Sequence, residues 1–218
     1  MERAGKFDVA GFKAFLFDMD GVLADNCGYH VVAWLEFAKR HGFELTEKQV
    51  IDWMGAPGSY YVERMLGRKP SPAELMRLAE EKEAVYREIY APHAKLPAGL
   101  RALLDGAHAH GVPCAVVTGG PLSNVDFLMD ALALRGDFVF VVDASQYERG
   151  KPAPDCYLQG AARLGVAPAE CLVFEDAVNG IQAGRAAGMR VVAITGTNPR
   201  AVLEAAEADC VIDSFTEL

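Results

Sequence analysis

The chain has 218 residues, of which 51% are hydrophobic and 23% charged, and its formal net charge at pH 7 is −9. This length is enough for one or two domains whose core needs no disulfide or metal to fold. The acidic balance argues against nucleic acid and anionic membranes as main partners, although a local group of cations can still bind a small anion.

The chain shows no membrane or export signal and no cysteine pattern. No apolar run approaches the roughly 20 residues of a membrane span, and the first six residues lack the features of a signal peptide. The five cysteines have neither a paired nor a zinc-like spacing. We therefore expect a cytoplasmic protein with reduced cysteines.

Six short apolar runs recur along the chain, and each is continuous, as in strands that are covered on both faces. Segments of helical length and composition separate the later runs. This alternation predicts an α/β fold with a doubly wound, Rossmann-like parallel sheet. The apolar runs are 14–17, 114–117, 138–142, 171–174, 191–194 and 210–212, and the helical segments are 100–110, 123–133, 155–164, 178–187 and 199–208.

The stretch between the first two runs has no strand-like segment and is too long for a simple loop. Ser71-Pro72-Ala73-Glu74 has the form of a capping box with proline at the first helical position. Apolar residues follow it at helical spacing and form one face. We therefore predict a small α-helical cap domain at residues 27–95, inserted into a core domain that consists of residues 1–26 and 96–218.

Acidic residues follow two of the predicted strands. Asp18 and Asp20 end the first run two positions apart, and Gly21 permits a sharp exit from the strand. Glu175 and Asp176 end the fourth run in the same way. Ligands of doubly wound sheets bind at the carboxyl ends of strands, and Mg²⁺ prefers oxygen ligands. Two acidic strand ends in one sheet therefore indicate a magnesium site, whereas either one alone would indicate a solvated turn.

Four segments together resemble, in chain order, the motifs of the haloacid dehalogenase (HAD) superfamily. The resemblance spans nearly the whole chain, and the helical insertion is similar to that superfamily's small helical cap. Among its branches, the β-phosphoglucomutase and sugar-phosphatase group is the most similar. The segments are Phe17-Asp18-Met19-Asp20-Gly21-Val22-Leu23, Val117-Thr118-Gly119, Gly150-Lys151-Pro152-Ala153-Pro154-Asp155 and Phe174-Glu175-Asp176-Ala177.

This resemblance implies a role for each carboxylate. Asp18 is the expected nucleophile, which becomes an aspartyl phosphate. Asp20 is the expected general acid and base, and its backbone carbonyl is an expected magnesium ligand. Asp18 and Asp176, together with Glu175, are expected to complete the metal site.

The resemblance also implies which residues bind the substrate. Thr118 and Gly119 are expected to bind the phosphoryl oxygens, and Lys151 to supply a fixed positive charge. In the cap, His30 and Lys82 match positions that contact substrate in the β-phosphoglucomutase group. Each has a simpler interpretation, because a helix-surface histidine and a lysine beside acidic neighbours are common without any ligand.

One departure from the mutase pattern favours a phosphatase. Within Met54-Gly55-Ala56-Pro57-Gly58-Ser59, Gly58 stands where the mutases carry an arginine for a second phosphate, although Arg64 is nearby. We therefore predict a Mg²⁺-dependent phosphohydrolase that acts on a small phosphorylated metabolite, either a sugar phosphate or a short-chain organophosphate. The chain is expected to be a monomer or a weak homodimer.

Two alternatives remain. A β-phosphoglucomutase-like phosphotransferase would return the phosphate to a sugar hydroxyl instead of to water. A non-catalytic phosphate-binding regulator would have lost a catalytic carboxylate, yet Asp18, Asp20, Lys151 and Asp176 are all present.

Overall fold

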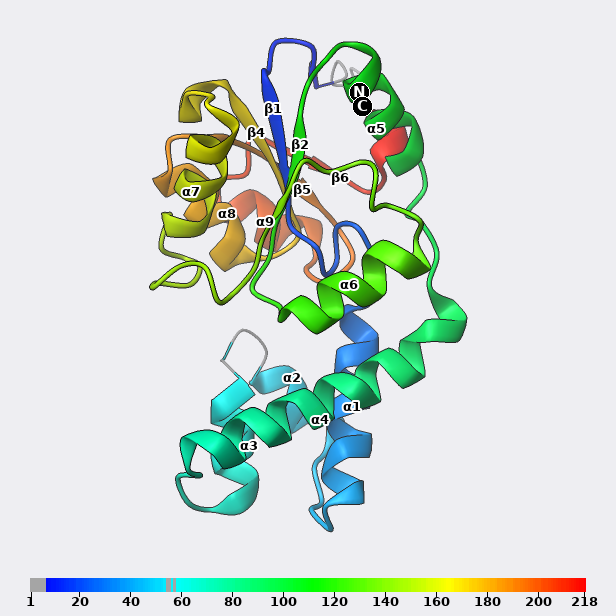
Figure 1. Ribbon diagram of the computed structural model, residues 1–218, viewed down its shortest axis with the longest axis vertical. Helices are drawn as coiled ribbons and strands as arrows, with labels where there is room; N and C mark the ends of the chain where they lie inside the picture. Colours follow the sequence, from blue (N-terminus) through cyan, green and yellow to red (C-terminus); the bar gives the residue numbers. More distant parts are fainter. Residues whose placement is uncertain (1–6, 54–55, 57) are drawn as a thin grey trace. The chain divides into compact units, whose positions relative to one another are not determined.

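A parallel sheet forms the centre of the larger unit of this protein, whose computed structural model describes residues 7–53, 56 and 58–218. Within these residues the sheet has six strands in the order β3-β2-β1-β4-β5-β6 (Figure 1). The order reverses beside β1, between its two neighbours β2 and β4, and such a switch point is where doubly wound sheets bind ligands. The strands are β1 (Ala14–Phe17), β2 (Cys114–Val117), β3 (Val141–Val142), β4 (Cys171–Glu175), β5 (Arg190–Ile194) and β6 (Cys210–Ile212).

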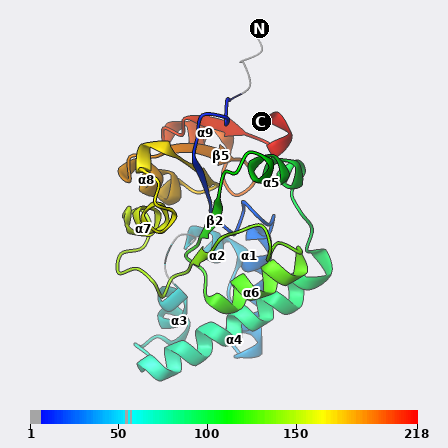
Figure 2. The same cartoon turned by 45° about the horizontal axis from the view of Figure 1, so that its top comes forward.

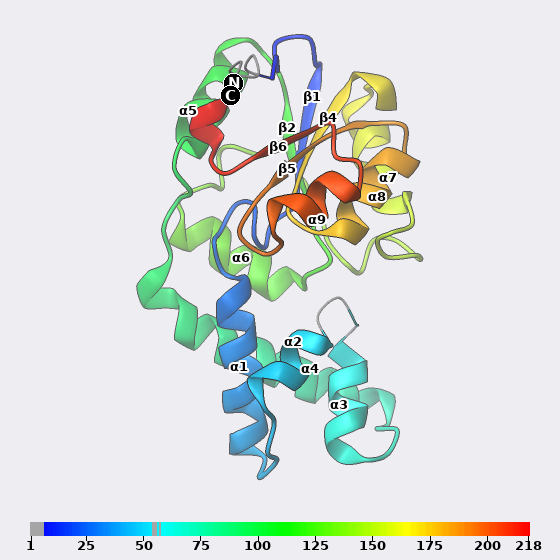
Figure 3. The ribbon, with the colours of Figure 1, turned by 180° about the vertical axis from the view of Figure 1, so that it is seen from behind.

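Helices cover both faces of this sheet, which confirms the predicted doubly wound α/β fold. Helices α5 and α6 lie on one face, and α7, α8 and α9 lie on the other (Figures 2 and 3). The helical segments of this unit are α5 (Leu100–Ala109), α6 (Leu122–Ala131), α7 (Asp155–Leu164), η2 (Pro168–Glu170), α8 (Val178–Ala186), α9 (Arg200–Ala205) and η3 (Phe215–Glu217).

Strand β1 is buried on both faces, because its side chains alternate between two cores. Leu16 belongs to the core that also contains Tyr157 and Ile181, from α7 and α8. Phe17 faces the other way and stacks on Phe174 with ring centroids 4.5 Å apart. This double burial explains why the run is continuously apolar and ends abruptly in carboxylates.

Two predicted elements are shorter than expected. The run 138–142 yields only β3, because it lies at the sheet edge, where it pairs with β2 alone and leaves Val139 67% exposed. The helix expected at 199–208 ends at Ala205, and Glu207 adopts a φ of 62°, in the left-handed region that breaks a helix.

The second unit comprises Asn26–Ala94 and is helical. Its core packs Trp34 against Tyr61, with stacked rings 4.4 Å apart, and includes the buried Phe37 and Leu78. The helical segments are α1 (Cys27–Arg40), α2 (Glu47–Asp52), α3 (Gly58–Leu66), α4 (Pro72–Tyr90) and η1 (Ala91–His93).

The predicted capping box at the start of α4 is only half formed. The Ser71 side chain accepts a hydrogen bond from the Glu74 amide, as expected. The Glu74 carboxylate instead accepts two hydrogen bonds of 2.8 Å from Arg68. The bidentate arginine contact replaces the weaker bond back to the cap residue.

Two further observations concern the chain as a whole. All five cysteines are free thiols in this structure. Among the residues that the structure describes, no helix is both long and apolar enough to cross a membrane.

Candidate active site

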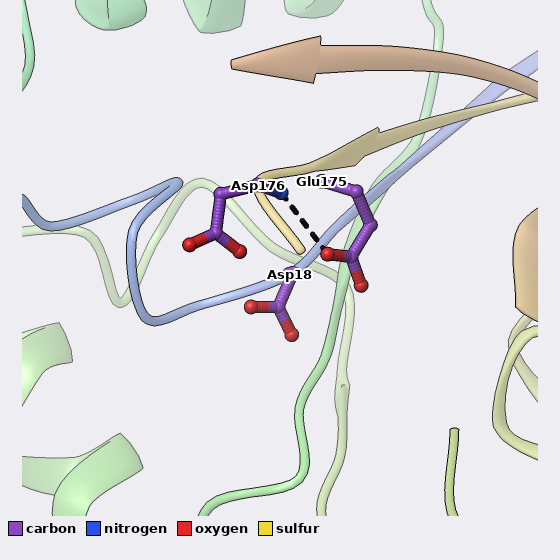
Figure 4. Close-up of side chains that lie close together, drawn as sticks. All are labelled: Asp18, Glu175 and Asp176. Carbon is purple, nitrogen blue, oxygen red and sulfur yellow. Dashed lines mark hydrogen bonds between the residues drawn. The ribbon is translucent and has the colours of Figure 1, made fainter. Parts of the chain in front are cut away.

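Three of the four predicted acidic residues, Asp18, Glu175 and Asp176, meet at the carboxyl ends of β1 and β4, beside the switch point of the sheet (Figure 4). Asp18 follows β1, Glu175 is the last residue of β4, and Asp176 follows it. Each offers a carboxylate oxygen, and these oxygens all lie within 4.8 Å of one another. We call Asp18, Glu175 and Asp176 the carboxylate cluster.

A glycine allows the chain to leave β1 beside this cluster. Gly21 has a φ of 77°, which is unfavourable for other residues. A Cβ atom at Gly21 would lie 1.9 Å from Asp176 Oδ2. Any side chain at position 21 would therefore displace the Asp176 carboxylate.

Lys151 is the cation bonded to the carboxylate cluster. Its Nζ donates to Asp18 Oδ1 at 2.5 Å and to Glu175 Oε1 at 2.6 Å, with a longer contact of 3.3 Å to the Val117 carbonyl oxygen. The side chain is only 10% exposed. The lysine precedes α7 by four positions. Only the resemblance to the HAD superfamily predicted that it would lie at this site.

The two oxygens of Glu175 are fully occupied by donors from the protein. Oε1 accepts from Lys151 and, at 2.7 Å, from the Tyr157 hydroxyl. Oε2 accepts from the backbone amides of Asp176 and Ala177 at 3.0 and 3.3 Å. An ionised carboxylate has about four lone-pair sites, and four donors occupy those of Glu175. Glu175 is therefore better suited to holding Lys151 and the neighbouring backbone in place than to binding a metal ion.

Burial disfavours the ionised forms of the carboxyl groups in the carboxylate cluster. It raises the pKa of Asp18 well above the ordinary range, and the charges of Glu175 and Asp176 add to this rise while Lys151 opposes it. Burial and the charge of Glu175 raise the pKa of Asp176 to about 7. The Lys151 ammonium group forms ion pairs with Asp18 and Glu175, and an additional cation would stabilise the ionised forms of all three carboxyl groups.

The donor chemistry of the cluster fits a hard divalent cation. Its ligand atoms are carboxylate oxygens, and Mg²⁺ binds through one or two carboxylates while it keeps several waters. Asp18 and Asp176 meet this requirement, and Glu175 holds the lysine that borders them.

The β2 loop, by which we mean residues 118–120, follows the strand that pairs with β1 and provides polar groups at that end of the sheet. Thr118 is buried at the end of β2, and its hydroxyl accepts a hydrogen bond from the Gly120 amide at 2.9 Å. Its carbonyl accepts from the Tyr147 hydroxyl at 3.0 Å, which holds the loop. A Cβ at Gly120 would lie 3.7 Å from Asp20 Oδ2, so Asp20 borders this loop, and Gly119 is exposed.

His30 and Lys82 lie in the helical unit, where they contact each other. Lys82 Nζ donates to His30 Nδ1 and to Glu83 Oε1, each at 2.9 Å. The ammonium also lies 5.1 Å from the centre of the Trp34 ring, and Lys82 is only 3% exposed. We call His30, Lys82 and Glu83 the Lys82 cluster.

Three residues that support the site were missed by the sequence analysis. The side chain of Asn198 donates to the Asp176 carbonyl at 3.0 Å. Gly180 leaves room for Glu175, because a Cβ there would lie 1.8 Å from Glu175 Oε1. Tyr157 reads in the sequence as an ordinary core residue of its helix, so no local signal identifies its hydroxyl contact.

Comparisons with known proteins agree with this geometry. The family model for haloacid dehalogenase-like hydrolases matches residues 12–188. Hexitol phosphatase A from Escherichia coli (strain K12) is 37% identical over 210 residues, which cover 94% of this chain and 93% of that protein. β-Phosphoglucomutase from Bacillus subtilis (strain 168) is 30% identical over 195 residues, which cover 86% of this chain and 85% of that protein.

A solved structure extends the agreement to the fold. The HAD hydrolase of family IA, variant 3, from Entamoeba histolytica superposes with a TM-score of 0.87 at 29% identity, covering 94% of this chain and 95% of that one. The matched region includes β1, β2 and β4 with every residue of the carboxylate cluster. The family suggested by the four motifs is thus confirmed, and this chain belongs to the haloacid dehalogenase-like hydrolases.

Proposed function

We propose that this protein is a Mg²⁺-dependent phosphohydrolase that removes phosphate from a small phosphorylated sugar or polyol through an aspartyl phosphate at Asp18. The observation that carries this proposal is the buried Asp18 carboxylate, which lies at the switch point of the sheet and within hydrogen-bond distance of Lys151. The similarity to a hexitol phosphatase supports the substrate class.

In the first half-reaction, a carboxylate oxygen of Asp18 forms a bond to phosphorus while the bond from phosphorus to the substrate oxygen breaks. Asp20 donates a proton to this leaving oxygen, so that a neutral alcohol departs. Lys151 is bonded to Asp18 Oδ1, which leaves Oδ2 as the oxygen available for attack.

In the second half-reaction, water forms a bond to phosphorus and gives its proton to Asp20. The bond between phosphorus and Asp18 breaks, which releases inorganic phosphate and regenerates both carboxyl groups. Asp20 borders the β2 loop and is half-buried, so it can exchange protons with a group bound at the strand ends.

Several groups must share the charge of the transferred phosphoryl group. Phosphate monoester hydrolysis can require accelerations up to about 10²¹, whereas one acid or base contributes about 10²–10⁴. We propose that Lys151, the Thr118 hydroxyl and the backbone amides of the β2 loop at Gly119 bind the phosphoryl oxygens.

Asp18 and Asp176, with the backbone carbonyl of Asp20, would hold the magnesium ion, and Glu175 borders the site as the anchor of Lys151. When bound, Mg²⁺ offsets the negative charge of the phosphate and of the carboxylates as they approach each other. The crowding of buried carboxylates in the metal-free protein supports this assignment.

We propose that the helical unit is the cap domain of this family and that it selects the leaving group. Its buried cation, Lys82, and the neighbouring His30 are the residues that we assign to contact with the sugar or polyol. This assignment comes from the resemblance to the β-phosphoglucomutase group together with the burial of an ammonium group in a small helical unit.

Phosphorus NMR on a panel of substrates with Mg²⁺ tests the function. The panel contains hexitol phosphates, hexose phosphates and a short-chain phosphate, each with and without EDTA. We expect the inorganic phosphate signal to grow with wild-type protein and to stay absent with EDTA or with Asp18→Asn. Phosphate release that needs no divalent cation, or that survives in Asp18→Asn, would contradict the proposal.

A substrate with a good leaving group tests the intermediate. Nitrophenolate leaves without a proton, so an Asp20→Asn variant should still be phosphorylated by nitrophenyl phosphate but should hydrolyse the intermediate slowly. We expect a burst of one nitrophenolate per enzyme and a mass increase of one phosphoryl group. A linear time course with unmodified protein would argue against the covalent intermediate.

A mutase is the second candidate, because the β-phosphoglucomutase of Bacillus subtilis is among the relatives. The expected mutase arginine falls in the segment 54–59, of which Met54, Gly55 and Pro57 lie outside the described residues. Gly58 begins α3, and the guanidinium of Arg64 lies over the Tyr60 ring, 4.8 Å from its centre. Arg64 is exposed, and its guanidinium packs against the partly buried rings of Tyr60 and Trp53.

One reaction separates the two candidates. With β-glucose 1-phosphate and a trace of glucose 1,6-bisphosphate, a phosphatase releases inorganic phosphate. Accumulation of glucose 6-phosphate with little free phosphate would establish the mutase instead.

A further inference from the structure

Tyr157 is a buried tyrosine that contacts two charged residues of the site. Its side chain is fully buried in the core of the larger unit, on the third residue of α7. The hydroxyl donates to Glu175 Oε1 at 2.7 Å. Lys151 Nζ lies 5.0 Å from the centre of the ring, within the range of a cation–π contact.

The position of the Tyr157 hydroxyl depends on how closely α7 packs against the sheet. Gly160 lies one turn later on the same buried face of the helix. A Cβ there would lie 3.1 Å from Leu16 Cδ2 and 3.3 Å from Val117 Cγ2, which is tighter than ordinary contact. The glycine therefore brings α7 close to β1 and β2, and the tyrosine hydroxyl is carried to the end of β4.

The Tyr157 hydroxyl affects how strongly Glu175 binds Lys151. Glu175 Oε1 accepts from Tyr157 as well as from Lys151, and burial raises the pKa of Tyr157, so the hydroxyl stays protonated and can donate. Without this donor, Lys151 would be the only side-chain partner of Oε1 within the described residues. The ammonium would then bind Glu175 more strongly and Asp18 less well, because both carboxylates compete for it.

We propose that Tyr157 is a positioning residue for phosphoryl transfer: its hydroxyl satisfies Glu175 and its ring supports Lys151, so that the lysine stays within bonding distance of Asp18. This inference rests on the proposed function and assigns no contact between Tyr157 and the substrate. The effect is transmitted through Glu175 and Lys151 to the nucleophile.

A tyrosine-to-phenylalanine substitution tests the proposal, because Tyr157→Phe keeps the ring and removes only the donor. We expect kcat and kcat/KM to fall together by about 10-fold with an unchanged KM, since the contact acts on the transferring phosphoryl group. A kcat equal to that of the wild type, or a change confined to KM, would overturn the proposal.

A double variant separates positioning from a general loss of stability. Glu175→Gln removes the group through which Tyr157 acts, so Tyr157→Phe should lower kcat by less than about 2-fold in that background. An equal loss in both backgrounds would show that the tyrosine does not act through Glu175.

Tyr61→Phe is the matched control, because Tyr61 is also buried and its hydroxyl donates to the Val50 carbonyl, far in sequence from any residue of the carboxylate cluster. We expect it to lower the melting temperature without changing kcat. A loss of kcat similar to that of Tyr157→Phe would show that any buried hydroxyl has this effect, and would overturn the proposal.

A second variant covers the case in which Tyr157→Phe does not fold. In Gly160→Ala the added methyl group lies within 3.1–3.3 Å of the Leu16 and Val117 side chains, so α7 or these side chains must shift by a few tenths of an ångström. We expect a fall in kcat of about 3-fold at constant KM. Folded Gly160→Ala with wild-type kcat would overturn the proposal. Failure of the proposed function looks different, because the wild type itself would then release no phosphate.

Discussion

The two units of this protein each bury a lysine against carboxylates, and the balance of charge differs between them. In the larger unit, Lys151 is bonded to two members of the carboxylate cluster, and the third, Asp176, lies close by. In the helical unit, Lys82 is bonded to a single carboxylate, that of Glu83, and to the imidazole of His30.

The difference shows which buried charges are arranged for chemistry. Burial and neighbouring carboxylates raise the pKa values of both Asp18 and Asp176, although Lys151 opposes the rise, so a further cation would favour their ionised forms. In the Lys82 cluster, the ammonium group lies 2.9 Å from the Glu83 carboxylate, and the two form an ion pair. The first arrangement suits a metal-assisted reaction, and the second suits a fixed hydrogen-bond donor.

The largest expected effect comes from removing the nucleophile. Asp18→Asn should lower kcat by more than about 10³-fold, because an amide does not form the covalent intermediate. Steady-state phosphate release measures the loss, and circular dichroism checks the fold. Activity near that of the wild type would remove Asp18 from the proposed mechanism.

Loss of the lysine in the carboxylate cluster should affect both activity and stability. Lys151→Met should lower kcat by about 10²–10³-fold, since it removes a fixed charge from the transferred group. It should also lower the free energy of unfolding of the metal-free protein by about 3 kcal/mol, because two buried carboxylates lose their partner. Thermal melts with EDTA and with Mg²⁺ should differ more for this variant than for the wild type. An equal difference would indicate that no metal ion binds beside Lys151.

The Lys82 cluster should instead behave as a balanced pair. Lys82→Met should lower the free energy of unfolding by about 3 kcal/mol, because the largely buried Glu83 carboxylate loses its ion pair with the Lys82 ammonium group. The double variant Lys82→Met/Glu83→Gln should recover at least about 1 kcal/mol of this loss. Denaturant titrations of the two single variants and the double variant measure the coupling, and strict additivity would refute the pairing.

The smallest expected effect is an increase in the free energy of unfolding instead of a decrease. The pKa of Asp176 is raised to about 7 in the folded protein. This group therefore lowers stability as the pH rises from the ordinary carboxyl value to about 7, and the full cost remains above 7. In EDTA at pH 8, Asp176→Asn should therefore raise the free energy of unfolding by about 2 kcal/mol, or the melting temperature by roughly 4–8 °C.

Measurements of Asp176→Asn at lower pH and with Mg²⁺ provide the control. Near pH 5 the Asp176 carboxyl is already protonated in the folded state, so most of the gain should disappear. With Mg²⁺ at pH 8, the wild type should gain stability and the variant should not. A melting temperature that rises equally at both pH values would contradict the raised pKa.

Much of this molecule could be predicted from its sequence, because the relevant signals are local. Continuous apolar runs and the helical segments between them determine a parallel sheet that is covered on both faces, and the fold confirms this. Of the acidic residues expected to meet at the ends of β1 and β4, Asp18, Glu175 and Asp176 do so, since parallel strands place their carboxyl ends at one edge.

Only the tertiary structure decided which partners each charged group has. Glu175 was expected to be a metal ligand like its neighbours, yet its oxygens are occupied by Lys151, Tyr157 and two amides. Lys82 was expected beside substrate, and it is bonded to Glu83 and His30. The sequence determines which groups are available at a strand end or on a helix. The hydrogen bonds that these groups form depend on how closely helices such as α7 and α4 pack, and that packing is set by contacts throughout the fold.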